Sequence, residues 1–288
     1  MNLTLPHFQP SAMRIYLAPI RSDSPSSLRT GICRGRARQI PRGFTLVEIA
    51  IAVFIITLLL GSILVPLTTQ VEQRQVGETQ KILEDIKEAL VGHAIAKQYL
   101  PCPDRTSGGA GTANDTANDG VEDYNTGTGI CFSTTATGNV PWVTLNLGAM
   151  DSWGNRFRYR VHSAYAQRSP AAPFNLSTAT NLTVTATSGG TLLTSASPDG
   201  AVAVIISHGK NGYGAMNAQT NILRPNPPVA NSDESDNQGG TTYTSRVPTV
   251  IATPCGAVGQ PLCEFDDIVI WMGKYTLFQR MVAAGKLP

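Results

Sequence analysis

The hydrophobic pattern of the chain is dominated by an apolar run from Phe44 to Leu67, which carries a single ionisable residue, Glu48. As an α-helix this run would be roughly 36 Å long, because each residue advances a helix by about 1.5 Å. The hydrocarbon core of a bilayer is about 30 Å thick, so residues 44–67 are predicted to form a transmembrane helix. The apolar region of a secretory signal is shorter, about 7–15 residues, and a small-residue cleavage site follows it.

A second pattern follows the apolar run directly. Between residues 68 and 100, apolar residues such as Leu83, Ile86 and Leu90 recur at helical spacing, and charged residues fill the positions between them. This amphipathic spacing predicts that the helix continues into a soluble head and packs one face on it. Pro101 ends the predicted helix, because a proline disfavours the helical conformation in the residue before it.

Beyond the helix, short apolar runs predict β-strands, after a long polar surface loop at residues 104–139. The predicted strands are residues 157–161, 182–186, 201–206 and 268–271, followed by a last helix at 274–284. We therefore predict an α+β fold, in which one long N-terminal helix, half transmembrane and half amphipathic, packs on a mostly antiparallel β-sheet. Residues 101–288 form the globular, β-rich head of this arrangement.

The charge of the chain is unevenly distributed. Residues 1–43 carry seven arginines and one acid, a net charge of +6, whereas the whole chain is +2, so residues 44–288 carry −4. Basic flanks favour the cytoplasmic side of a membrane, which predicts that residues 1–43 are a cytoplasmic leader and that the head is exported. Because the positive charge belongs to the leader, the exported part gives no indication of nucleic-acid binding.

The acid within the apolar run indicates a function. An acidic residue at the centre of a membrane span costs about 3 kcal/mol, so such residues are usually kept for a purpose. The segment from Arg42 to Glu48, RGFTLVE in one-letter code, resembles the processing site of type IV prepilins and type II secretion pseudopilins. The resemblance implies that a peptidase cuts after Gly43 and that the new N-terminal residue, Phe44, is methylated. It also implies that Glu48 pairs with the N-terminal amine of a neighbouring subunit during assembly.

The same resemblance implies a pilin-like fold and a structural function. We expect a subunit of a periplasmic pseudopilus or type IV pilus that serves type II protein secretion. We expect a minor subunit, because the head is larger than that of a major pseudopilin. The expected partners are other pilin or pseudopilin subunits, the prepilin peptidase and methyltransferase, and inner-membrane lipid. The expected location is the bacterial inner membrane, crossed once, with the head in the periplasm or on a filament.

Two other classes of function are compared with this one. A membrane-anchored periplasmic binding module or adhesin is the alternative, because the head contains long polar stretches such as residues 211–245. An enzyme is not expected, because the chain has neither a His-Glu-x-x-His nor a Gly-x-Ser-x-Gly motif. Ser207 and His208 are neighbours in the sequence, which does not make them a nucleophile and its base.

The cysteines indicate disulfides. Cys33 lies in the leader, and the four that remain after the expected cleavage are Cys102, Cys131, Cys255 and Cys263. An even number in an exported domain suggests disulfide bonds, and four cysteines allow three connectivities. We favour Cys102–Cys131, which would staple the long loop onto the helix end, and Cys255–Cys263, which would close a short loop. A metal site is the competing interpretation, but a Cys-x-x-Cys motif and nearby histidines are missing.

Two further segments resemble those that frame a calcium-binding loop in the major pseudopilins. Residues 207–212, SHGKNG, follow the predicted central strand, and residues 264–268, EFDDI, precede the last one. The resemblance implies that Asp266 and Asp267 are calcium ligands. The acidic residues between the two segments, Asp233, Glu234 and Asp236, also supply the oxygen atoms that Ca²⁺ prefers. The intervening segment is longer than in that family, and a solvated acidic loop is the alternative.

Overall fold

The computed structural model describes residues 43–108, 115–132, 137–250, 254–256 and 260–286, and only the backbone of residues 62–67. The chain divides into two compact units, Met1–Ile56 and Thr57–Pro288, and helix α1 contributes to both. The helices are α1 (Leu46–Lys97), α2 (Trp142–Leu145), the 3₁₀ helix η1 (Ser163–Tyr165), α3 (Ser232–Asp236) and α4 (Lys274–Ala283). The strands are β1 (Tyr124–Asn125), β2 (Ile130–Cys131), β3 (Thr137–Asn139), β4 (Arg158–Val161), β5 (Thr183–Thr185), β6 (Ala201–Ser207), β7 (Thr242–Thr244) and β8 (Ile268–Gly273).

The larger unit is of the α+β class and is built on a four-stranded antiparallel sheet with the strand order β3-β4-β6-β8. β6 lies between β4 and β8, and all seven of its residues are buried. Its continuous apolar sequence suits this position, because a strand covered on both faces has no side for polar residues. The four predicted strands and the last helix are confirmed, within one or two residues, as β4, β5, β6, β8 and α4. A small second sheet pairs β5 with β7 in parallel.

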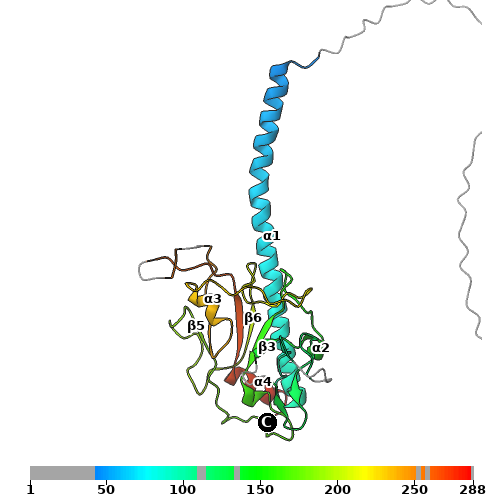
Figure 1. Ribbon diagram of the computed structural model, residues 1–288, viewed down its shortest axis with the longest axis vertical. Coiled ribbons are helices and arrows are strands. Elements are labelled where there is room, and N and C mark those ends of the chain that lie inside the picture. Colours follow the sequence, from blue (N-terminus) through cyan, green and yellow to red (C-terminus); the bar gives the residue numbers. More distant parts are fainter. Residues whose placement is uncertain (1–42, 109–114, 133–136, 251–253, 257–259, 287–288) are drawn as a thin grey trace, which may run out of the picture. The chain divides into compact units, whose positions relative to one another are not determined.

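The hydrophobic core lies between the C-terminal part of α1 and one face of the sheet. Leu83, Ile86 and Leu90 are fully buried there, three and four residues apart, against strand residues that include Tyr159 and Val202. This part of α1 is drawn in cyan in Figure 1. Each such leucine stabilises the fold by about 1.5–3 kcal/mol through burial. The other face of the sheet packs with β5 and β7 around Val204, Ile206 and Tyr243.

The prediction that the N-terminal half of the helix spans a membrane is wrong. Among the residues that the structure describes, none of the helices combines the length and the apolar character that crossing a membrane requires. A span needs about 20 consecutive apolar residues. Helix α1 runs from Leu46 to Lys97, and it carries Glu48 in its first turn and charged residues such as Glu72 and Arg74 further along. The fold prediction is corrected in this part, and the predicted single-pass location in the inner membrane is wrong with it.

Both favoured disulfides are confirmed. Cys102 and Cys131 are bonded across 29 residues, and Cys255 and Cys263 across 8 residues. The first joins the chain just after α1 to strand β2, so it holds one end of the long polar loop against the core. Residues 1–42, which contain most of the predicted leader and Cys33, lie outside the described residues.

Candidate functional site

Of the segment predicted to carry processing and assembly, residues 42–48, the structure describes Gly43 and the residues after it. Helix α1 begins at Leu46 and is capped by Thr45. The Glu48 N–H donates to Thr45 Oγ1 at 3.2 Å, and the Thr45 N–H donates to Glu48 Oε2 at 3.5 Å. This reciprocal pair is a capping box, which satisfies two backbone N–H groups at the helix N-terminus. Glu48 therefore has a local structural role, which its Thr-x-x-Glu spacing with Thr45 already signals in the sequence.

The smaller unit exposes apolar side chains on all sides of α1. Nine large apolar residues between 44 and 56 are 49–88% exposed: Phe44, Leu46, Val47, Ile49, Ile51, Val53, Phe54, Ile55 and Ile56. Consecutive residues of a helix point in different directions, so a run such as residues 53–56 covers its whole circumference. Soluble monomers rarely expose contiguous apolar surface of this kind, and such surfaces usually mark an interaction site.

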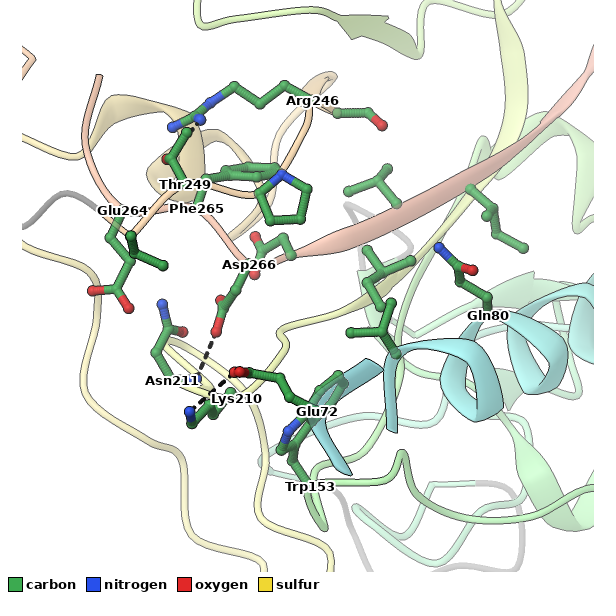
Figure 2. Close-up of a pocket in the computed structure, with 18 of the residues that line it drawn as sticks. Glu72, Gln80, Trp153, Lys210, Asn211, Arg246, Thr249, Glu264, Phe265 and Asp266 are labelled. Carbon is green, nitrogen blue, oxygen red and sulfur yellow. Dashed lines mark hydrogen bonds and ion pairs between the residues drawn. The ribbon is translucent and has the colours of Figure 1, made fainter. Parts of the chain in front are cut away.

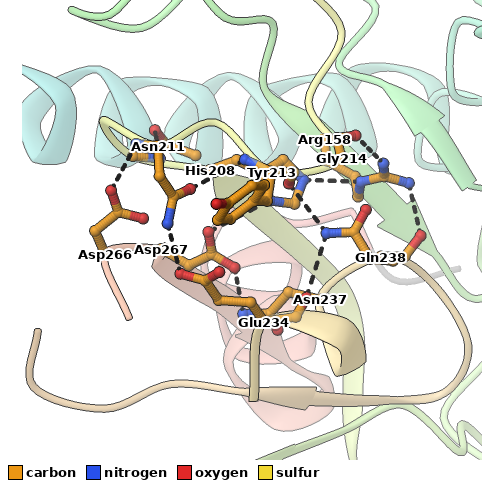
Figure 3. A network of polar contacts seen from close by, with 12 residues as sticks. Arg158, His208, Asn211, Tyr213, Gly214, Glu234, Asn237, Gln238, Asp266 and Asp267 are labelled. Carbon is orange, nitrogen blue, oxygen red and sulfur yellow. Dashed lines mark hydrogen bonds and ion pairs between the residues drawn. The ribbon is translucent and has the colours of Figure 1, made fainter. Parts of the chain in front are cut away.

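A second candidate site lies in the larger unit and consists of three carboxylates, which we call the acidic cluster. Glu234 comes from α3, and Asp266 and Asp267 lie just before β8. One oxygen atom of each carboxylate lies within 4.8 Å of the other two. Glu234 and Asp267 are buried, and Asp266 is partly buried. The structure thus brings the two predicted ligands together and adds Glu234 to them (Figure 3).

The other two acids proposed as oxygen donors lie elsewhere. Asp233 is paired with Arg246, with 2.5 Å between Oδ2 and Nε. Asp236 accepts a hydrogen bond from Thr244 Oγ1 at 3.2 Å. Since α3 is a helix, Asp233, Glu234 and Asp236 point in different directions, and only Glu234 faces the loop before β8.

Amide groups hold the carboxylates of the acidic cluster in position. Asn211 donates from its backbone N–H to Asp266 Oδ2 at 2.8 Å and from its side chain to Glu234 Oε1 at 2.9 Å. Asn237 Nδ2 donates to Asp267 Oδ2 at 2.8 Å. The loop after β6 passes close to Asp266 at Gly209, whose φ is +55°. A Cβ built on Gly209 would lie 2.4 Å from the backbone oxygen of Asp266. A side chain at residue 209 would therefore displace this loop.

A buried histidine, His208, faces the acidic cluster, and Arg158 donates a hydrogen bond to this histidine. His208 is fully buried, and its Nε2 accepts a hydrogen bond from Arg158 Nε at 3.0 Å. Because Nε2 is an acceptor, the ring proton belongs on Nδ1, which faces Asp267 Oδ1 at 3.4 Å. Arg158 also donates to the backbone oxygens of Gly214 at 2.7 Å and Gln238 at 2.7 Å. His208 lies in the segment 207–212 that the resemblance placed beside the calcium loop, whereas Arg158, 50 residues from His208 in the chain, was not predicted to lie there.

Burial raises the proton affinity of two carboxylates of the cluster, Glu234 and Asp266. Burial is the main cause that raises the pKa of Glu234 to about 8, with a further contribution from the charge of Asp267. Burial likewise raises the pKa of Asp266 to about 7, again assisted by Asp267. Both effects disfavour the charged form, so the cluster holds protons near neutral pH unless a cation takes their place.

The residues of the acidic cluster fit a hard cation. Within the described part of the chain, the buried Asp266 Oδ1 has no hydrogen-bond partner, and the buried Asp267 Oδ1 makes no hydrogen bond and faces His208 Nδ1 at 3.4 Å. Buried acceptors without partners are costly, and a cation would satisfy them. An all-oxygen donor set suits Ca²⁺ or Mg²⁺, and Ca²⁺ would need further oxygens from backbone carbonyls or water to complete its six to eight ligands. Glu234, Asp266 and Asp267 would hold the ion, whose charge would offset their mutual repulsion.

A pH dependence follows from these pKa values. Without divalent cations, the native state holds more protons than the unfolded chain between the ordinary carboxyl pKa and the raised values of about 7 and about 8. The stability of the larger unit is therefore expected to fall as the pH rises from about 5 to about 8. Calcium at millimolar concentration is expected to reverse much of that fall, because it binds the native state. Thermal unfolding at several pH values, with EGTA or with calcium, measures both effects.

Asp266→Asn is the matched variant for this experiment. The new amide can still accept the Asn211 N–H, and its NH₂ group can donate toward the other two carboxylates. We expect this variant to show a flatter pH dependence in EGTA and a smaller response to calcium. An unchanged pH dependence in Asp266→Asn would show that the acidic cluster is not its origin.

Comparisons with protein-family models, with curated proteins and with solved structures each found no match to the chain.

Proposed function

We propose that this chain is a structural subunit of a filament, a type II secretion pseudopilus or a type IV pilus. In this proposal a prepilin peptidase cuts the precursor after Gly43, Phe44 becomes the methylated N-terminus, and subunits assemble through the N-terminal part of α1. The RGFTLVE segment at residues 42–48 supports processing, and the long polar head is compatible with a minor subunit. The proposed role is structural, with no catalytic step assigned to any residue.

The observation that carries the proposal is the exposed apolar surface of residues 44–56. Burying one fully exposed large apolar side chain contributes about 1.5–3 kcal/mol, and because the nine of this segment are only 49–88% exposed, burying them would contribute on the order of 10 kcal/mol. That gain is comparable to the cost of ordering two proteins in a complex, about 4–15 kcal/mol. Because the apolar side chains surround the helix, one flat partner could cover only part of them. Several neighbouring helices, as in a filament, would cover them all.

Glu48 has two roles in this proposal. In the precursor it is part of the capping box with Thr45. After cleavage, the new α-amino group at Phe44 would lie four residues before Glu48, near the positive end of the helix dipole. A carboxylate can pair with the amine of a neighbouring subunit in a dry interface, where charge–charge attraction is much stronger than in water. The charge would therefore matter for assembly and the capping bond for the helix.

The N-terminus of the protein isolated from cells tests the processing step. Mass spectrometry is expected to find a chain that starts at methylated Phe44. A chain that keeps residues 1–43 in cells with an active prepilin peptidase would contradict the proposal.

Two variants separate the roles of Glu48. Glu48→Gln can keep the capping box, since glutamine serves at this position as well, but it removes the charge. Thr45→Ala removes the cap and keeps the charge. Glu48→Gln is expected to block incorporation into filaments, whereas Thr45→Ala is expected to incorporate and to lose only about 1 kcal/mol of helix stability. Quantifying each variant in sheared filaments measures this, and normal incorporation of Glu48→Gln would remove the assembly role of the charge.

A further inference from the structure

A groove of about 830 Å³ opens on the larger unit between α1, strand β8 and the segment 245–250. One wall is a single ridge of α1, formed by residues four apart: Glu72, Val76, Gln80 and Glu84. The opposite side includes Phe265 and residues 268–270 of β8 (Figure 2). The volume lies within the range of about 300–1,000 Å³ that is usual for binding sites in proteins.

The groove runs along an open sheet edge. β8 is the last strand of the four-stranded sheet, with β6 as its neighbour on one side only. In the described part of the chain, the backbone of β8 forms no hydrogen bond to any strand other than β6. Alternate N–H and C=O groups of such an edge strand point outward and can pair with another extended chain.

The opposite edge of the sheet differs from this one. There Asp104 pairs with Asn139 of β3 through two backbone hydrogen bonds, of 3.0 Å and 2.7 Å, so this edge is covered at Asn139. Near β8, the segment that pairs with this side of the sheet does so only before the strand begins, among the described residues. Thr249 and Phe265 exchange backbone hydrogen bonds of 2.9 Å and 3.0 Å just before β8 begins, and among the residues that the structure describes this pairing goes no further along the strand. The covered β3 edge provides an internal control for any experiment on β8.

The sequence of β8 lacks the features that usually block an edge. Its residues 268–273 are IVIWMG, with no charged residue and no proline to discourage pairing. Ile268 and Ile270 are only partly buried and lie on the face that packs toward α1. An added strand would extend the sheet and place alternate apolar side chains under the ridge that contains Val76.

The charged residues that line the groove favour a partner with a basic side chain. Five carboxylates line it, Glu72, Glu84, Glu264, Asp266 and Asp267, against two cations, Lys210 and Arg246. Both cations already have carboxylate partners: Lys210 with Glu72 at 3.0 Å, and Arg246 with Asp233, which is outside the groove lining. Glu264 and Asp266 lie at the same end of the groove (Figure 2). A basic side chain bound there would be attracted by Glu264 and would favour the charged form of Asp266, whose pKa burial raises to about 7.

We propose that this groove binds an extended segment of a partner protein by strand addition to β8, with a lysine or arginine of that segment at the Glu264 and Asp266 end. Backbone pairing with β8 supplies affinity, and the apolar ridge and the acidic end supply selectivity. This binding function does not depend on the proposed filament role.

The test uses the full chain and a synthetic probe, a heptapeptide of alternating valine and threonine with one lysine, in buffer with EGTA. Hydrogen exchange followed by mass spectrometry reports on each edge of the sheet separately. We expect the peptide to slow amide exchange in residues 268–272 by about tenfold or more at saturation and to leave residues 137–139 of β3 unchanged. Unchanged exchange in β8 at millimolar peptide, or equal slowing at β3, would overturn the proposal.

Matched probes and variants test the two parts of the proposal. A peptide with proline at its central residue cannot donate there and is expected to bind at least about tenfold more weakly. A peptide with glutamate in place of lysine, and the lysine peptide with the Glu264→Gln variant, are also expected to bind more weakly. Glu78→Gln changes an exposed acid of α1 outside the groove and is expected to have no effect. Equal binding of the proline peptide would exclude strand addition, and equal binding of the glutamate peptide would exclude the basic partner.

Discussion

Replacing Arg158 with methionine is expected to lower the free energy of unfolding of the larger unit by about 3–5 kcal/mol. Arg158 donates to three acceptors on separate segments: His208 Nε2 and the backbone oxygens of Gly214 and Gln238. Methionine has a similar length but no donor, so all three acceptors would lose their partner. Each buried acceptor left alone costs about 1–3 kcal/mol. The loops that carry Gly214 and Gln238 would lose their common attachment to β4.

Arg160 is the matched control, because it lies two residues further on the same strand and the same face. It is buried, yet its guanidinium donates to a single side chain, Thr137, at 3.2 Å, and its Nε has no partner within the described residues. Removing a poorly satisfied buried charge is often neutral, so Arg160→Met is expected to cost less than about 1 kcal/mol. Urea unfolding followed by tryptophan fluorescence reports on the larger unit, which contains Trp142, Trp153 and Trp271. Equal losses in the two variants would contradict the role assigned to Arg158.

Arg158→Lys refines the same experiment. Lysine keeps the positive charge but cannot reproduce the planar fork that reaches three acceptors. An intermediate loss of about 2 kcal/mol is expected. A lysine variant as stable as the original protein would mean that charge, and not the donor geometry, accounts for the effect.

Loss of the Cys102–Cys131 disulfide is expected to destabilise the larger unit by about 3–4 kcal/mol. The bond closes a loop of 29 residues, and the entropy that a cross-link removes from the unfolded chain increases with loop length. The double alanine variant also leaves the surroundings of residue 102 less well packed, since the Cys102 side chain that it removes is fully buried. Its neighbours include the Arg168–Glu122 pair, and the Cys102 N–H donates to Glu122 Oε2 at 3.1 Å.

The second disulfide is the control for the first. Cys255 and Cys263 close a loop of only 8 residues, so their double alanine variant is expected to lose about 2–3 kcal/mol. Denaturant unfolding of both variants gives the difference, and limited proteolysis adds a local readout. Cleavage between residues 103 and 130 is expected to accelerate only when the longer loop is released. A larger loss from the shorter loop would contradict the assignment of Cys102–Cys131 as the main staple.

The elements of the larger unit could largely be predicted because their signals are local. The apolar alternation around Tyr159, the continuous run of residues 201–206 and the spacing of Leu83, Ile86 and Leu90 each identify an element from its own residues. The two disulfide pairings could be favoured for a related reason, since each bond connects cysteines that close a recognisable loop. The prediction of a membrane span relied on the apolar run alone and was wrong.

The candidate sites could be predicted only in part, because they join residues that are far apart in the sequence. Asp266 and Asp267 are adjacent in the sequence, so their proximity could be expected, but Glu234 reaches them from α3 across about thirty residues. No periodicity relates Arg158 to His208, or the 72–84 ridge of α1 to β8, because packing of distant segments creates those neighbours. Residue patterns along the chain therefore account for the α+β elements, the cysteine staples and the RGFTLVE segment. The acidic cluster, the arginine that supports it and the open edge of β8 arise from folding, because contacts between remote segments depend on how the whole core closes.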